Sequence, residues 1–66
     1  MQLTINGEAR EIDDSLTVEQ LIERLGMQGR RLAVEINQEI LPRSRFVEHR
    51  LSDGDRIEIV RAIGGG

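Results

Sequence analysis

Short stretches of the chain alternate apolar and polar residues with a period of two. The alternation is clearest over residues 2–6, 32–37 and 56–63. A period of two places successive side chains on opposite faces of a strand, so each stretch predicts a half-buried β-strand. In the last stretch, Ile57 and Ile59 fall on the core-facing side. Because the first and last stretches are the most apolar, we expect their strands to be central in the sheet.

Two weaker segments follow short turns and complete the predicted sheet. Asn6–Gly7 predicts a hairpin, since a type I′ turn requires positive φ at both central residues. Residues 8–12 are then the returning strand, and their few apolar side chains place it at or near an edge. Asn37–Gln38 predicts a second turn, which leads to a short strand over residues 39–41. Pro42 stops that strand, because proline cannot donate to a hydrogen-bond ladder.

One helix is predicted after the first hairpin. Thr17 is the expected N-cap residue, and Gln20, three residues later, completes a capping box. The helix presents one apolar face with spacings of three and four, formed by Val18, Leu21, Ile22 and Leu25. Gly26 is the expected C′ residue. A helix laid across one face of a four- or five-stranded sheet buries both apolar faces, which predicts an α+β fold.

The length and composition of the chain exclude several classes of function. Its 66 residues allow a single domain, and the absence of cysteine removes thiol nucleophiles and thiolate zinc sites. The one histidine, His49, cannot hold a metal alone and is expected at the surface or rim. A net charge of −3 argues against a nucleic-acid binder, and no apolar run approaches a membrane span. We therefore expect one cytoplasmic domain that binds no metal, nucleic acid or membrane.

Acidic pairs and arginine-rich segments are the remaining charged features. Asp13–Asp14 and the pair formed by Asp53 and Asp55 lie beside turn residues, so we interpret them as capping and turn acceptors. Arg30–Arg31 and the three arginines within residues 43–50 either form a solvated face or contact an acidic protein surface. Residues 43–50 show no clean period and predict a turn or a short 3₁₀ helix.

The chain closes with three glycines, Gly64, Gly65 and Gly66. Glycine loses the most backbone entropy on ordering, so this segment does not favour a stable fold. Without side chains it can enter a narrow channel and present the α-carboxylate of Gly66 to another protein. A frayed chain end explains the same residues equally well. We predict a folded body over residues 1–63 and a flexible tail over residues 64–66.

An apolar patch precedes these glycines. Strand alternation places Glu58, Val60 and Ala62 on the face of the sheet that points away from the helix. Val60, Ala62 and Ile63 then lead directly into the tail, and we interpret them as a partner interface. Ordinary exposed apolar residues, which are common on protein surfaces, are the alternative interpretation.

From end to end, the chain resembles the ThiS family of sulfur carrier proteins of thiamine biosynthesis. The resemblance rests on Asn6–Gly7, the Asn37 turn, residues 40–43, 51–55 and 57–60, and the closing residues 63–66. It implies a ubiquitin-like β-grasp fold, with a mixed sheet and one helix across one face. The sequence departs from the family at Phe46, where tryptophan is common; we expect this phenylalanine to point inward.

The resemblance also implies a reaction sequence at Gly66. An E1-like adenylyltransferase uses ATP and magnesium to adenylate its carboxylate, and sulfur derived from a cysteine desulfurase then leaves a thiocarboxylate. Thiazole synthase takes this sulfur to build the thiazole ring of thiamine. The chain is then a recycled co-substrate rather than an enzyme; it binds no cofactor itself and is a monomer when free. A molybdopterin-type sulfur carrier, a ubiquitin-like protein modifier and a plain β-grasp interaction module remain as alternatives.

All nine basic residues other than the histidine are arginine. An activated acyl group is open to attack by amines, so a chain without lysine cannot acylate its own side chains. Codon bias is the competing explanation.

Overall fold

The computed structural model describes residues 1–12 and 15–61. Its elements are β1 (Gln2–Ile5), β2 (Glu8–Glu11), α1 (Val18–Arg24), β3 (Leu32–Ile36), β4 (Glu39–Leu41), the 3₁₀ helix η1 (Arg43–Arg45) and β5 (Arg56–Arg61). Every predicted element is therefore present. The expected extension of the last strand to residue 63 and the Asp13–Asp14 pair lie outside the described residues.

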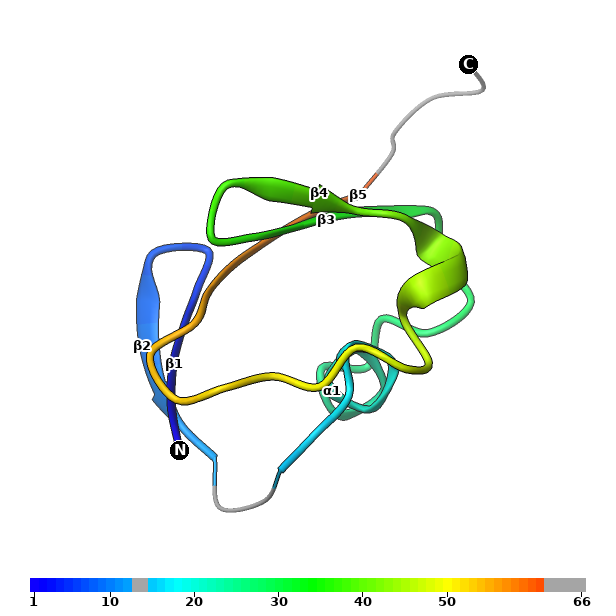
Figure 1. Ribbon diagram of the computed structural model, residues 1–66. Coiled ribbons are helices and arrows are strands. Elements are labelled where there is room, and N and C mark those ends of the chain that lie inside the picture. Colours follow the sequence, from blue (N-terminus) through cyan, green and yellow to red (C-terminus); the bar gives the residue numbers. More distant parts are fainter. Residues whose placement is uncertain (13–14, 62–66) are drawn as a thin grey trace.

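The five strands form one mixed sheet in the order β2-β1-β5-β3-β4 (Figure 1). β1 and β5 run parallel, with Ile5 opposite Ile57, whereas the other neighbouring strands are antiparallel. As predicted, β1 and β5 are interior strands and β2 is an edge strand, all of whose residues are exposed. A mixed five-stranded sheet with one helix confirms the expected β-grasp fold.

Both hairpin turns have the backbone geometry that their residues predict. Asn6 and Gly7 have φ values of 49° and 82°, as a type I′ turn requires. Asn37 and Gln38, with φ values of 51° and 72°, form an equivalent turn between β3 and β4. A two-residue turn of this kind matches the twist of the flanking strands and fixes their register.

Side chains and backbone groups close both ends of α1. Thr17 Oγ1 accepts from the Gln20 N–H at 3.2 Å, and Gln20 Oε1 accepts from the Thr17 N–H at 2.9 Å, which confirms the capping box. At the other end, Gly26 has a φ of 72° and its N–H donates to Glu23. The Met27 N–H donates to the Ile22 carbonyl at 3.0 Å, which completes a Schellman motif.

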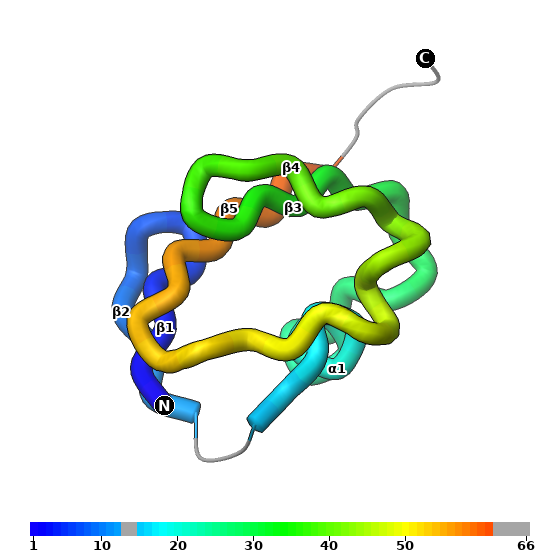
Figure 2. The backbone as a smooth tube through the Cα atoms, viewed as in Figure 1, coloured from blue at the N-terminus to red at the C-terminus, as the bar shows by residue number. Residues whose placement is uncertain are grey.

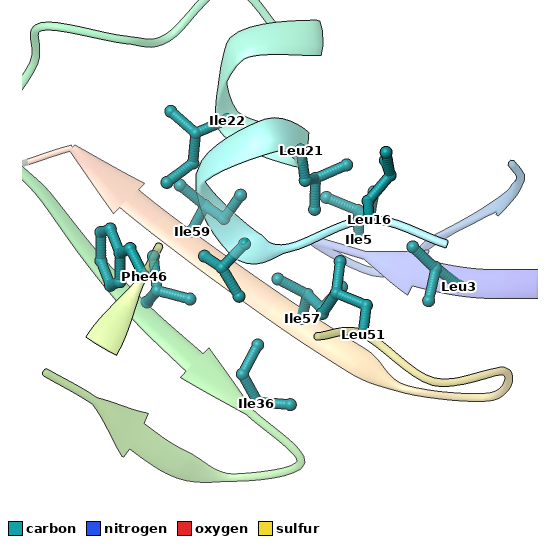
Figure 3. Packing of buried hydrophobic residues seen from close by; sticks show 12 residues of the cluster. Leu3, Ile5, Leu16, Leu21, Ile22, Ile36, Phe46, Leu51, Ile57 and Ile59 are labelled. Atoms are coloured by element: carbon teal, nitrogen blue, oxygen red, sulfur yellow. The ribbon is translucent and has the colours of Figure 1, made fainter. Parts of the chain in front are cut away.

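The core lies between α1 and the inner face of the sheet. Its buried residues are Leu3, Ile5, Leu16, Val18, Leu21, Ile22, Val34, Ile36, Phe46, Leu51, Ile57 and Ile59. Figure 3 shows Leu21 and Ile22 projecting from the helix toward the strands. The burial of Ile57, Ile59 and Phe46 confirms the predicted orientation of these side chains.

The segment from Phe46 to Asp55 runs past α1 and reaches β1 before it turns into β5 (Figure 2). The Val18 N–H donates to the His49 carbonyl at 2.9 Å, and the Leu51 N–H donates to the Leu16 carbonyl at 2.8 Å. The Gly54 N–H then donates to the Gln2 carbonyl at 2.7 Å. This path brings residues 54–55 alongside β1, so β5 begins opposite Thr4 and runs in the same direction as β1.

Candidate functional site

β5 is the strand that leads toward the glycines, and it is the central strand of the sheet. It pairs with β3 from Ile57 to Arg61 and with β1 at Arg56 and Ile57. The predicted site residues Ala62, Ile63, Gly64, Gly65 and Gly66 lie outside the described residues. Their roles, and the division into a body and a tail, therefore stay predictions. What the structure places is the strand from which they continue.

Alternate residues of β5 are exposed and share a surface with β3 and β4. Val60 is 61% exposed and lies opposite Ala33 of β3. Glu58 lies opposite Glu35, which in turn lies opposite Ile40 of β4. Ile40 is 78% exposed. We call these five residues the outer patch; the exposure of Glu58 and Val60 confirms the orientation predicted for β5.

Three members of the outer patch, Ala33, Glu35 and Ile40, were not predicted from the sequence. Val60 can be placed from the alternation within β5 alone, but its neighbours depend on how separate strands align. One usable signal was the Asn37–Gln38 turn, because a two-residue hairpin turn fixes the register of its strands. That register pairs Glu35 with Ile40. No local pattern gives the pairing of β3 with β5.

The outer patch contains two like charges at its centre. Glu35 and Glu58 are both exposed and directly opposite each other across an antiparallel pair. Like charges in directly opposed positions destabilise a sheet, because the two side chains project side by side from the same face and their charges repel each other. Neither glutamate forms an ion pair with another residue in the described part of the chain. The patch thus combines exposed apolar side chains with an uncompensated negative charge.

The other candidate residues have structural roles or lie in solvent. His49 is partly exposed, as predicted for a residue at the rim. Asp55 accepts from the Ser52 N–H at 2.8 Å, which confirms its predicted turn role, and from Asn37 Nδ2 at 3.0 Å. Asp53 accepts from the Gln2 N–H of β1, so its role is structural but links two distant segments. No group of three or more His, Cys, Asp or Glu residues within the described ranges could hold a metal ion.

The two arginine-rich segments singled out from the sequence lie on the surface. Their five arginines are all exposed: Arg30, Arg31, Arg43, Arg45 and Arg50. Arg45 Nε lies 3.8 Å from a Glu48 carboxylate oxygen, an exposed ion pair of the kind that contributes little stability. This arrangement fits the solvated face that was one of the two expectations, whereas a contact with an acidic protein surface stays a prediction. Among the described residues, no helix is long and apolar enough to cross a membrane.

Comparison with known families identifies the chain. Residues 3–66 match the model of the ThiS family. The chain belongs to the ThiS family. The match covers both the described fold and the glycines that follow β5, and it confirms the resemblance drawn from the sequence motifs.

This ThiS-family chain is similar both to proteins named sulfur carrier protein ThiS and to proteins named thiazole synthase. It is 36% identical to the sulfur carrier protein ThiS of Escherichia coli, over the full length of both chains. It is 50% identical to a thiazole synthase of Paramagnetospirillum magneticum, but spans only 20% of that protein's length. The crystal structure of a thiamine biosynthesis protein (ThiS) from Geobacter metallireducens superposes with a TM-score of 0.86 at 38% identity, with full coverage of both chains.

Proposed function

We propose that this chain carries sulfur for thiamine biosynthesis as a thiocarboxylate on Gly66. The broader role, that of a sulfur carrier protein rather than an enzyme, follows from its ThiS family membership and agrees with the prediction from the sequence. The observation that carries the finer proposal is the position of β5. The strand that leads to Gly66 is the central strand of the sheet, and its outer face exposes Val60, four residues before Gly64 in the sequence.

The proposed chemistry begins with activation of a poor electrophile. A carboxylate oxygen of Gly66 attacks the α-phosphorus of ATP, and pyrophosphate leaves, so an acyl adenylate forms. The terminal sulfur of a protein persulfide then attacks the acyl carbon, the C–O bond breaks and AMP leaves. A second thiol reduces the resulting acyl disulfide, which releases the Gly66 thiocarboxylate and forms a new disulfide. ATP and magnesium belong to the activating partner in this scheme, and the chain supplies only the acyl group.

Three partners follow from this chemistry. The first is an E1-like adenylyltransferase, and the second is a persulfide source that a cysteine desulfurase charges. The third is thiazole synthase, which takes the sulfur from Gly66. Two relatives named thiazole synthase match the whole of this chain over 20% of their own length, so a ThiS-like segment occurs within proteins of that name. This covalent linkage supports a partnership between the two activities.

Mass spectrometry tests the proposal directly. The chain is incubated with an adenylyltransferase, ATP and a persulfide source, and the intact mass is measured. We expect one oxygen atom to be replaced by sulfur, at Gly66 by fragmentation. Deletion of Gly66 should abolish the change, whereas Ser52→Ala, at an exposed position in the loop that precedes β5, should leave it intact.

Other outcomes of this experiment separate the alternatives. Isopeptide conjugates to target lysines would identify a protein modifier instead of a carrier. A sulfur adduct that persists after deletion of Gly66 would overturn the proposed site. Transfer of sulfur to the large subunit of molybdopterin synthase, with none to thiazole synthase, would identify the chain as a molybdopterin-type sulfur carrier instead.

A further inference from the structure

The edge of β5 that faces β1 carries a regular series of backbone hydrogen bonds. The Thr4 N–H donates to the Asp55 carbonyl at 3.0 Å, and the Asn6 N–H donates to the Ile57 carbonyl at 2.9 Å. The next backbone groups on this edge belong to Ile59, because alternate residues of a strand face the same neighbour. The main chain of β1 does not continue to Ile59, since it turns at Asn6 and Gly7 into β2.

The side chain of Asn6 takes the place of the missing backbone. Its Oδ1 accepts from the Ile59 N–H at 2.8 Å, and its Nδ2 donates to the Ile59 carbonyl at 3.2 Å. A primary amide offers one acceptor and two donors, so it can pair with both backbone groups of one residue, as a peptide unit would. Asn6 thus extends the parallel ladder by one step beyond the end of β1.

We propose that Asn6 is a positioning residue for the tail. This inference rests on the proposed function at Gly66. On the β1 side of β5, the amide of Asn6 makes the last hydrogen bonds found in the described part of the chain, whereas the strand partners of Val60 and Arg61 lie on β3. The amide therefore holds Ile59 in place, and with it the end of β5 from which the glycines extend toward the adenylyltransferase. Small displacements of a reacting group reduce rates strongly, so the position of this strand end matters for chemistry at Gly66.

Asn37 provides a matched control within the same chain. Its φ of 51° is close to the 49° of Asn6, and it occupies the same position in its hairpin turn. Its Oδ1 accepts from the Arg56 N–H at 2.9 Å, and its Nδ2 donates to Asp55 Oδ1 at 3.0 Å. Asn37 thus binds the opposite end of β5, away from the tail. Removing either amide should lower the free energy of unfolding by a similar amount. Only removal of the Asn6 amide should slow formation of the thiocarboxylate at Gly66.

The first experiment measures the hydrogen bonds without any partner. Asn6→Gly and Asn37→Gly keep a residue that tolerates positive φ while removing the amide. By NMR hydrogen exchange, we expect the Ile59 N–H to exchange about fivefold to tenfold faster in Asn6→Gly, with the Arg56 N–H unchanged. Asn37→Gly should show the reverse pattern. Unchanged exchange at Ile59 in Asn6→Gly would overturn the inference.

The second experiment measures formation of the thiocarboxylate with the adenylyltransferase of the same organism, ATP and a persulfide source. We expect Asn6→Gly to lower kcat about fivefold or more while KM for the carrier stays within about twofold, because the outer patch is intact. Asn37→Gly should keep both constants near the wild-type values. A variant that is merely less folded would raise the apparent KM and leave kcat unchanged.

The outcomes separate this inference from the proposed function. Equal loss of kcat in Asn6→Gly and Asn37→Gly would show that Asn6 has no specific role in positioning the tail. A change in KM alone would show that the amide of Asn6 only stabilises the fold. If the wild-type chain itself forms no thiocarboxylate, the proposed function and the positioning role both fail. The exchange experiment would still report whether Asn6 holds Ile59.

Discussion

Glu35 and Glu58 lie opposite each other on the exposed face of the sheet, one on β3 and one on β5. Glutamine has nearly the same shape as glutamate but carries no charge. Glu58→Gln or Glu35→Gln therefore removes the repulsion between the two side chains and leaves the packing of the strands unchanged. We expect either substitution to raise the free energy of unfolding.

The register of the two strands sets the size of this effect. Directly opposed residues have Cβ atoms about 5 Å apart, which places the two carboxylates about 6 Å apart. Two unit charges at about 6 Å repel by about 0.7 kcal/mol in water. For a domain of this size, about 0.7 kcal/mol corresponds to an increase in Tm of about 3–5 °C. At about 1 M salt the Debye length falls to about 3 Å, so most of the effect should disappear.

Urea unfolding followed by circular dichroism measures the effect, since urea leaves the ionic strength unchanged. The wild type, the two single variants and the double variant are compared at low salt and in about 1 M NaCl. The second substitution should add little to the first, because the repulsion is already gone. The reasoning would be refuted if the increases in the free energy of unfolding from the two substitutions simply added, or if the increase remained in high salt.

Four further predictions follow from individual residues. Leu21→Ala should lower the free energy of unfolding by about 2–5 kcal/mol in urea titrations, because Leu21 is only 1% exposed; a loss below about 1 kcal/mol would contradict its place in the core. Thr17→Ala should cost about 1 kcal/mol in the same assay, whereas Thr17→Ser, which keeps the cap, should cost much less. Val60→Thr, which keeps a β-branched side chain and adds no charge, should leave unfolding unchanged within about 0.5 kcal/mol but weaken binding to the adenylyltransferase in calorimetry; unchanged affinity would remove Val60 from the interface. Arg61→Lys should yield self-linked or dimeric products during activation of Gly66, detectable by mass spectrometry, and their complete absence would favour codon bias.

Much of the fold was predictable because its signals are local. Asn6–Gly7 determines its own turn through the φ values that these residues tolerate, and Thr17 caps a helix that begins at the next residue. The alternation in β5 likewise predicted which of its side chains are buried. In each case the deciding interaction lies within a few residues along the chain. The resemblance to ThiS proteins also came from short motifs and the closing glycines.

The candidate site was predictable only in part. Val60 follows from the alternation of its own strand, whereas Ile40 joins the same surface through a hairpin register. The opposition of Glu35 and Glu58 depends on the register between β3 and β5, two strands that are far apart in the sequence because β4 and the segment after it lie between them. A shift of one residue in that register would send the side chains of one strand to the other face, so alternation alone cannot supply the pairs.

The amino-acid sequence by itself determined the turns, the helix with its caps, the inward and outward faces of the strands and the glycines that end the chain. Only the tertiary structure decided how β5 aligns with β1 and β3 and which side chains meet across those pairs. Asn6 shows the difference, because its turn is encoded by two adjacent residues while its amide binds Ile59, 53 positions away. Conformational preferences act over a few bonds, but hydrogen bonds between distant segments exist only after the whole chain has packed around its core.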